Sequence, residues 1–258
     1  MKHLPTICLI VLLPLALQAD CRIALQPPND IRKEFVRFDQ AFLPVLFYVN
    51  EGNSFEAKRA VFHLGYHWQQ LRHRYEMSMP QPDWRNTFQQ VDKYLDAAFF
   101  AIDANDFERA YTQLEKVKHT FFLLRTNYHI DYYIDYLYDF QASAAVLDET
   151  VNDEMLDLLQ WEDVMAMSVE LNRKWNMVLA KHFDADLYEL NEDQVWKLQA
   201  TQQSVTEALN VLNAAMDCAD RAIVADASAD LQLALLEVLR VFGNFEASAT
   251  YYANRQIE

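Results

Sequence analysis

Apolar residues recur at alternating steps of three and four along most of this chain, which is the spacing that lines one face of an α-helix. The first stripe starts at Ile31, after a capping Asn29 or Asp30, and stops before Gly52. Its members are Ile31, Phe35, Phe38, Phe42, Val45 and Val49. No alternation of apolar and polar residues is long enough to predict a strand, so the pattern predicts an all-α protein.

Similar stripes along the rest of the chain predict further helices joined by short turns, including a tyrosine-rich helix over about residues 131–146. The seventh stripe continues as far as Ile223 before the last helix begins. The residues expected to cap or break these helices are Ser54, residues 80–82, Asn105 or Asp106, Asn191, Ser228 and Gly243. Consecutive helices with one apolar face each pack as an up-and-down helical bundle.

The composition agrees with this fold class. The chain has 3 Gly and 7 Pro, well below the usual frequencies of about 7% and 5%. So few turn-forming residues leave little room for hairpins, phosphate-binding loops or a doubly wound sheet.

The chain also contains a weak internal similarity. Residues 101–118 align without a gap on residues 223–240, and each half has a helix with one seam tryptophan, Trp68 or Trp175. An internal duplication would produce two related bundles, but two unrelated helices with one heptad pattern would match equally well. The expected organisation is a signal peptide over 1–19, an N-terminal bundle over 20–127, an acidic tyrosine-rich helix and connection over 128–150, and a C-terminal bundle over 151–258.

The first residues have the features of a secretory signal peptide. Lys2 supplies a positive charge, an apolar stretch covers residues 4–17, and small Ala19 precedes a cleavage site before Asp20. A transmembrane helix needs roughly 20 apolar residues, so we expect export to the periplasm without a transmembrane anchor. Cys21 raises the alternative of lipidation, and Asp20 directly before it argues against that alternative.

Cys21 and Cys218 are the cysteines that remain after the expected cleavage. An oxidising compartment allows them to form a disulfide that closes a very long loop. Alternatively both thiols stay free, with Cys218 buried among the alanines of its helix. The sequence leaves both alternatives open because it does not supply the geometry of the pair.

The charge of the chain limits its partners. The formal net charge is −16, from 22 basic and 38 acidic residues. Nucleic acids and anionic membranes are unfavourable partners because both are bound through clustered Lys and Arg. An acidic surface instead favours cations, a basic protein or a redox partner.

The preferred interaction surface is an acidic and tyrosine-rich segment. No Lys or Arg occurs between Arg125 and Arg173, and the aspartates in this span include three spaced by four residues. Like charges at this spacing destabilise a helix, so packing, a bound cation or a basic partner must compensate. The residues predicted to bind a partner are Asp131, Tyr132, Tyr133, Asp135, Tyr136 and Asp139.

The histidines are the candidates for a metal or haem site. His63 and His67 are four residues apart, so both rings can lie on one helix face and bind copper or zinc. The heptad position of the helix places His63 outward and His67 on its flank, which makes solvated histidines the simpler interpretation. His182 continues the seam of its helix and is a candidate axial ligand of a non-covalent haem, with Met216 opposite, or else a hydrogen-bonded core residue. Iron is a further candidate metal, although no Glu-x-x-His motif for a di-iron site is present.

Catalytic signatures are missing from the sequence, which has no C-x-x-C-H, H-E-x-x-H or G-x-S-x-G motif. The first hypothesis is therefore an exported, non-catalytic binding or accessory protein. The alternative is a periplasmic helical bundle that binds a metal or haem, and an enzyme of another kind is a third choice.

Overall fold

A computed structural model describes residues 30–75, 82–153 and 161–247, and these residues form helices and connections without a strand. The helices are α1 (Ile31–Asn50), α2 (Ser54–Tyr75), α3 (Pro82–Asp103), α4 (Phe107–Asn127), α5 (Tyr133–Asn152), α6 (Trp161–Ala180), α7 (Glu192–Cys218) and α8 (Arg221–Arg240). The prediction of an all-α, up-and-down architecture is confirmed. None of the helices in the described ranges is long and apolar enough to cross a membrane. The expected signal peptide, the cleavage site and Cys21 lie outside the described residues.

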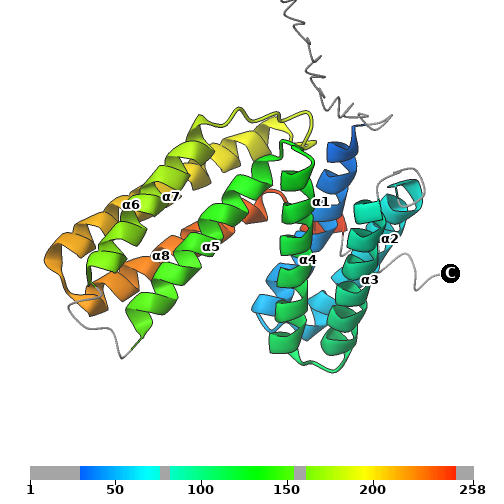
Figure 1. Cartoon of the computed structure of the whole chain (residues 1–258), viewed down its shortest axis with the longest axis horizontal. Coiled ribbons are helices and arrows are strands. Elements are labelled where there is room, and N and C mark those ends of the chain that lie inside the picture. The colour runs from blue at the N-terminus through cyan, green and yellow to red at the C-terminus, as the bar shows by residue number, and fades with distance from the viewer. Residues whose placement is uncertain (1–29, 76–81, 154–160, 248–258) are drawn as a thin grey trace, which may run out of the picture.

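The helices form two bundles of four, which lie beside each other at an angle (Figure 1). In the first bundle α1 packs against α2 and α4, and α3 packs against the same two helices. The second bundle repeats this order, because α5 packs against α6 and α8, and α7 packs against α6 and α8. Each bundle therefore closes its own apolar core, and the contacts between bundles are concentrated around α1, α4, α5 and the segments next to α7 and α8.

Aromatic rings fill the centre of the first bundle. The rings of Phe38 and Phe121 have centroids 5.0 Å apart, and Phe121 also meets Phe35 at 5.3 Å. Trp68 of α2 stacks on Phe88 of α3 at 5.4 Å. All five side chains were expected on apolar seams, and each is almost completely buried. Buried aromatic side chains of this size contribute strongly to the stability of a core.

The two seam tryptophans occupy equivalent positions in the two bundles. Trp68 lies on α2 and its indole nitrogen donates to Asp92 of α3 at 2.7 Å. Trp175 lies on α6 and donates to Thr206 of α7 at 2.9 Å. Each tryptophan thus links the second helix of its bundle to the third. The two segments of the ungapped match are not equivalent in the fold, because residues 101–118 span the turn from α3 to α4 whereas residues 223–240 lie within α8. The internal duplication remains a prediction.

The start of the last helix differs from the prediction. We expected α7 to continue to Ile223 and Ser228 to cap the next helix, but α7 ends at Cys218 and Ser228 is buried inside α8. Ala219 adopts a left-handed conformation with φ 51°, and the Asp220 side chain accepts from the backbone of Ala222 and caps α8. No Gly or Pro marks this turn in the sequence, and an alanine with positive φ is an unexpected place for a helix to end.

The predicted acidic connection is a full member of the second bundle. Residues 128–132 alone join the two bundles, and α5 begins at Tyr133 and packs against α6 and α8. The segment assigned to 128–150 as a separate unit is therefore mostly the first helix of the C-terminal bundle. This position gives α5 one face toward its own core and places its first turns against α4 (Figure 1).

A buried ion pair fixes α4 to α5 where the bundles meet. Arg125 is 1% exposed and donates from Nε and Nη2 to the two carboxylate oxygens of Asp135, at 2.8 and 2.5 Å. The guanidinium also lies 4.5 Å from the ring centroid of Tyr132 and 5.0 Å from that of Phe35. The two hydrogen bonds to the carboxylate and the contacts with the rings offset the free-energy cost of removing the guanidinium from water.

We expect Asp135→Ala to destabilise the protein by about 3–5 kcal/mol, because it leaves the charge of Arg125 buried without its counterion. Urea denaturation measures this difference. The matched control is Asp131→Ala, which removes an exposed carboxylate from an ion pair. This substitution should lower the free energy of unfolding by less than about 1 kcal/mol. If both variants lowered the free energy of unfolding by the same small amount, the buried ion pair would not be what holds α4 to α5.

Candidate functional site

Most of the predicted interaction residues come together around one cavity. It has a volume of about 350 Å³ and lies between the end of α4, the link 128–132, the start of α5 and the end of α6. Five of the six residues predicted to bind a partner line it, and Tyr133 does not. The lining residues are Phe122, Arg125, Thr126, His129, Ile130, Asp131, Tyr132, Asp135, Tyr136, Asp139 and Met177.

Every carboxylate of the predicted acidic row has a basic partner within the chain. Asp131 pairs with Lys181 at 2.6 Å, and Asp139 pairs with Lys174 at 2.8 Å. Asp135 pairs with Arg125, as described above. The repulsion expected between the three carboxylates is therefore offset inside the protein, by cations that come from α4, α6 and the residue after α6.

The row is also less regular than predicted. Asp131 precedes α5, so it is not on the same helix as Asp135 and Asp139. Asp135 is buried, whereas the side chains of Asp131 and Asp139 are 58% and 45% exposed. Only the two outer carboxylates can therefore meet a partner.

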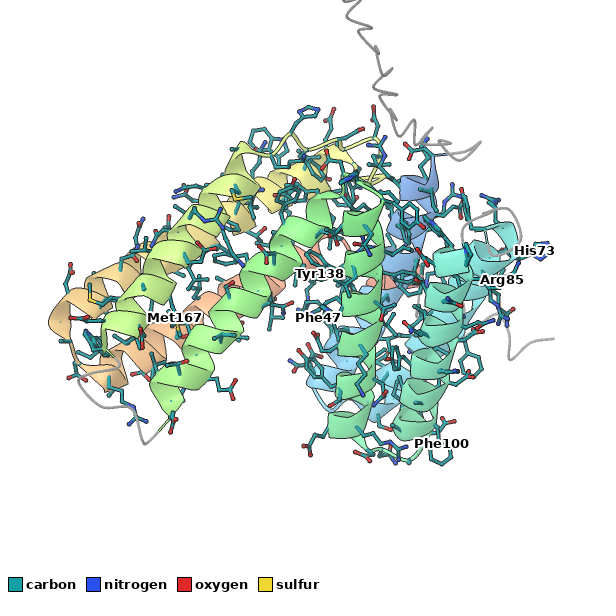
Figure 2. All side chains as sticks on the ribbon, in the orientation of Figure 1. Phe47, His73, Arg85, Phe100, Tyr138 and Met167 are labelled. Atoms are coloured by element: carbon teal, nitrogen blue, oxygen red, sulfur yellow. The ribbon has the colours of Figure 1, made fainter. Side chains whose placement is uncertain are left out.

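The tyrosines of this segment divide between core and cavity. Tyr132 and Tyr133, which were predicted to bind a partner, are buried, and Tyr138 is buried as well. The hydroxyl of Tyr133 accepts from Gln202 of α7 at 2.6 Å, so this residue belongs to the second core. Tyr138 lies on the side of α5 that faces α4, where the ammonium of Lys118 is 4.9 Å from its ring centroid (Figure 2). Tyr136 is half-buried at the cavity, with the Lys181 ammonium 5.0 Å from its ring centroid.

Behind the cavity, a second carboxyl group approaches the same arginine. Asp39 of α1 is 3% exposed and accepts a hydrogen bond from the hydroxyl of Tyr132 at 2.7 Å. Burial raises the pKa of Asp39 to about 6, against the opposing effects of Arg125 and of the Tyr132 hydrogen bond. Among the described residues, Nη1 of Arg125 and the hydroxyl of Tyr138 have no hydrogen-bond partner. The junction thus contains two carboxyl groups and one guanidinium, all removed from solvent.

Two of the three candidate histidines, His63 and His182, do not lie where the sequence placed them. His63 was expected outward, but it is 8% exposed, and its Nε2 lies 3.0 Å from Nε2 of the half-buried His67. His182 was expected on the seam of α6, but α6 ends at Ala180 and His182 is exposed. His182, a candidate haem ligand or core residue, is therefore not part of the core, whereas Met216, the candidate second ligand, is buried in α7. Cys218 is exposed at the end of α7 rather than buried.

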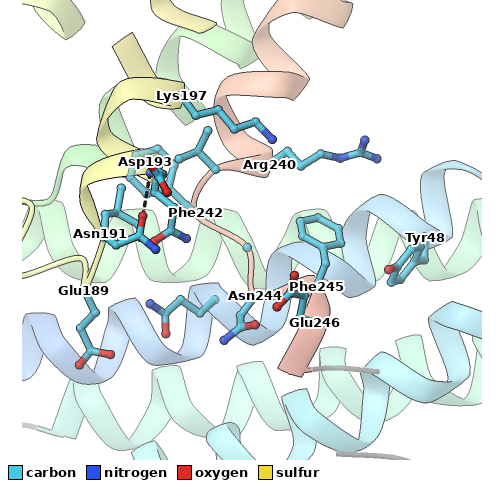
Figure 3. Close-up of a pocket in the computed structure, with 15 residues that line it drawn as sticks. Tyr48, Glu189, Asn191, Asp193, Lys197, Arg240, Phe242, Asn244, Phe245 and Glu246 are labelled. Atoms are coloured by element: carbon cyan, nitrogen blue, oxygen red, sulfur yellow. Dashed lines mark hydrogen bonds between the residues drawn. The ribbon is translucent and has the colours of Figure 1, made fainter. Parts of the chain in front are cut away.

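A larger cleft, with a volume of about 860 Å³, lies between α1, the start of α7 and the segment that follows α8 (Figure 3). Its walls carry Lys197 and Arg240 as well as Glu189 and Glu246. Arg240 is already engaged, because it pairs with Glu51 at 2.8 Å and lies against the rings of two phenylalanines. The sequence gives no signal for this cleft, because its residues come from three separated segments and share no local pattern.

No family model, no curated protein and no solved structure matches this chain.

The buried carboxyl of Asp39 predicts an unusual dependence of stability on pH. An aspartate in an unfolded chain has a pKa of about 3.9, so the folded protein holds this proton more tightly than the unfolded protein does. The contribution of Asp39 to the free energy of unfolding is fully present below about pH 4 and is lost as the pH rises through about 6. The free energy of unfolding changes by about 3 kcal/mol over this range.

We expect Asp39→Asn to remove this dependence, because the amide keeps an oxygen for the Tyr132 hydroxyl and carries no charge. The measurement is urea denaturation of both proteins at pH 4, 5, 6 and 7. The free energy of unfolding of the variant should increase relative to that of the native protein as the pH rises. Asp96→Asn, at an exposed position on α3, serves as the control. A difference between native protein and Asp39→Asn that does not vary with pH would contradict the assignment.

Proposed function

We propose that this protein is an exported, non-catalytic binding protein that engages a basic protein partner at the cavity between α4, α5 and α6. The observation that carries the proposal is that Asp131, from the link before α5, and Tyr136 and Asp139, from the first turns of α5, line one cavity. Carboxylates beside an aromatic ring recognise Lys and Arg side chains through charge and through cation–π contact.

Lys181 illustrates the kind of group that this cavity accepts. Its ammonium lies 2.6 Å from the Asp131 carboxylate and 5.0 Å from the Tyr136 ring centroid. A basic side chain of a partner can replace it, because the Asp131 side chain is 58% exposed and an exposed ion pair is weak. Lys174 forms a second ion pair, with Asp139, at 2.8 Å. The net charge of −16 would favour approach of a basic partner from a distance.

The pairing of the carboxylates also favours binding over catalysis. A general base needs a carboxylate that is free to take up a proton at the working pH. Asp131, Asp135 and Asp139 are each already engaged in an ion pair with a Lys or Arg of the chain. Carboxylates paired in this way suit recognition of a basic side chain.

The double variant Asp131→Asn/Asp139→Asn should weaken partner binding by at least about tenfold, since each substitution removes a charge at the cavity. The measurement is recovery of the partner from the exported fraction by immobilised mature protein, followed by a salt titration. The matched control is Asp226→Asn/Asp230→Asn, which makes the same change of charge at exposed positions of α8. Binding that survives in the first variant as in the second would disprove the role of the cavity.

Export is part of the proposal, on the strength of the apolar stretch over residues 4–17 and the small Ala19. We expect mass spectrometry of the protein recovered from its native cells to give a mature chain that begins at Asp20. A chain that retains Lys2, or that stays in the cytoplasm, would contradict export without affecting the assignment of the cavity.

A further inference from the structure

Two imidazole rings on α2 face each other at close range. His63 and His67 are one helical turn apart, their Nε2 atoms are 3.0 Å apart, and the ring planes are 86° from each other at a centroid distance of 4.6 Å. One ring therefore donates its Nε2–H to the Nε2 of the other. The binding cavity described above uses none of these atoms, so the pair is a separate feature of the first bundle.

The separation of the two nitrogens suits one bound ion. At a metal–nitrogen distance of about 2.0–2.1 Å, nitrogens 3.0 Å apart subtend roughly 95° at the metal. This angle is closer to the ligand angles of a tetragonal site than to those of a tetrahedral one. Tetragonal nitrogen sites are typical of Cu²⁺ and Ni²⁺, and Cu²⁺ has the highest affinity among the divalent first-row ions.

A metal ion can replace the hydrogen bond between the two rings. The ring that donates can carry its hydrogen on Nδ1 instead of Nε2, and both Nε2 atoms can then serve as metal ligands. The nearby Arg37 is held by Glu34 and Glu189, which reduces its repulsion of a cation.

We propose that His63 and His67 chelate a divalent transition-metal ion, with Cu²⁺ as the preferred occupant. Two histidines at i and i+4 project from one helix face and need no other segment to bring them together. Within the described ranges no third His, Cys, Asp or Glu groups with them. Water or an external ligand would complete the coordination of the ion.

The first test is calorimetric titration of Cu²⁺ into mature protein carrying Cys21→Ser and Cys218→Ser, which removes the competing thiols. We expect one strong site, weaker binding of Zn²⁺, and a loss of affinity of at least about tenfold in His67→Ala, because chelation by two ligands is lost. His73→Ala, at an exposed position on the same helix, is the matched control and should bind as the parent does. Absence of a strong site in the parent protein would overturn the proposal.

Pulsed electron paramagnetic resonance of the Cu²⁺ complex identifies the ligands directly. We expect the signature of two imidazoles in the parent and of one imidazole in His67→Ala and in His63→Ala. Circular dichroism verifies that each variant is folded, and His67→Ala tests the site even if loss of the more buried His63 unfolds the bundle. Two imidazoles in His67→Ala, or an unchanged affinity, would assign the copper to other residues and disprove this site.

Discussion

The ion pair between Arg125 and Asp135 is the interaction on which the arrangement of the two bundles depends. A guanidinium that is 1% exposed has to receive compensation for its lost hydration, and here it comes from the carboxylate and from the rings around it. These groups belong to α1, α4, the link 128–132 and α5. The pair can form only when the last helix of the first bundle and the first helix of the second are in place together.

The same pair determines how the neighbouring charges are arranged. Because Arg125 neutralises Asp135, the carboxyl of Asp39 is left without a full counterion, and burial then raises its pKa. Farther out, Lys174 and Lys181 neutralise the two carboxylates that solvent can reach. The ion pair of Asp135 is therefore buried, whereas the ion pairs of Asp131 and Asp139 lie where solvent reaches their carboxylates. Under the proposed function, these outer carboxylates exchange a lysine of the chain for a basic side chain of the partner.

Several features were accessible from sequence because they are local. Helix content, the seams around Phe38, Trp68 and Trp175, and the closeness of His63 to His67 follow from the spacing of residues on one helix. The burial of His63 did not follow, since the heptad pattern placed it outward and burial depends on what lies over the helix. The error at Ser228 has a similar origin, because the apolar stripe continued through a turn at Ala219 that no Gly or Pro announced.

The sequence by itself determined that this chain is an acidic, all-helical protein whose helices expose one apolar face each, and it singled out residues 131–139 as unusual. Only the tertiary structure decided that Asp135 and three of the tyrosines are interior groups, that the outer aspartates meet lysines about 35 to 50 residues away, and that α5 belongs to the second bundle. The reason is physical. The periodicity of a helix depends on near neighbours in the chain, whereas ion pairing and burial depend on which helices pack side by side.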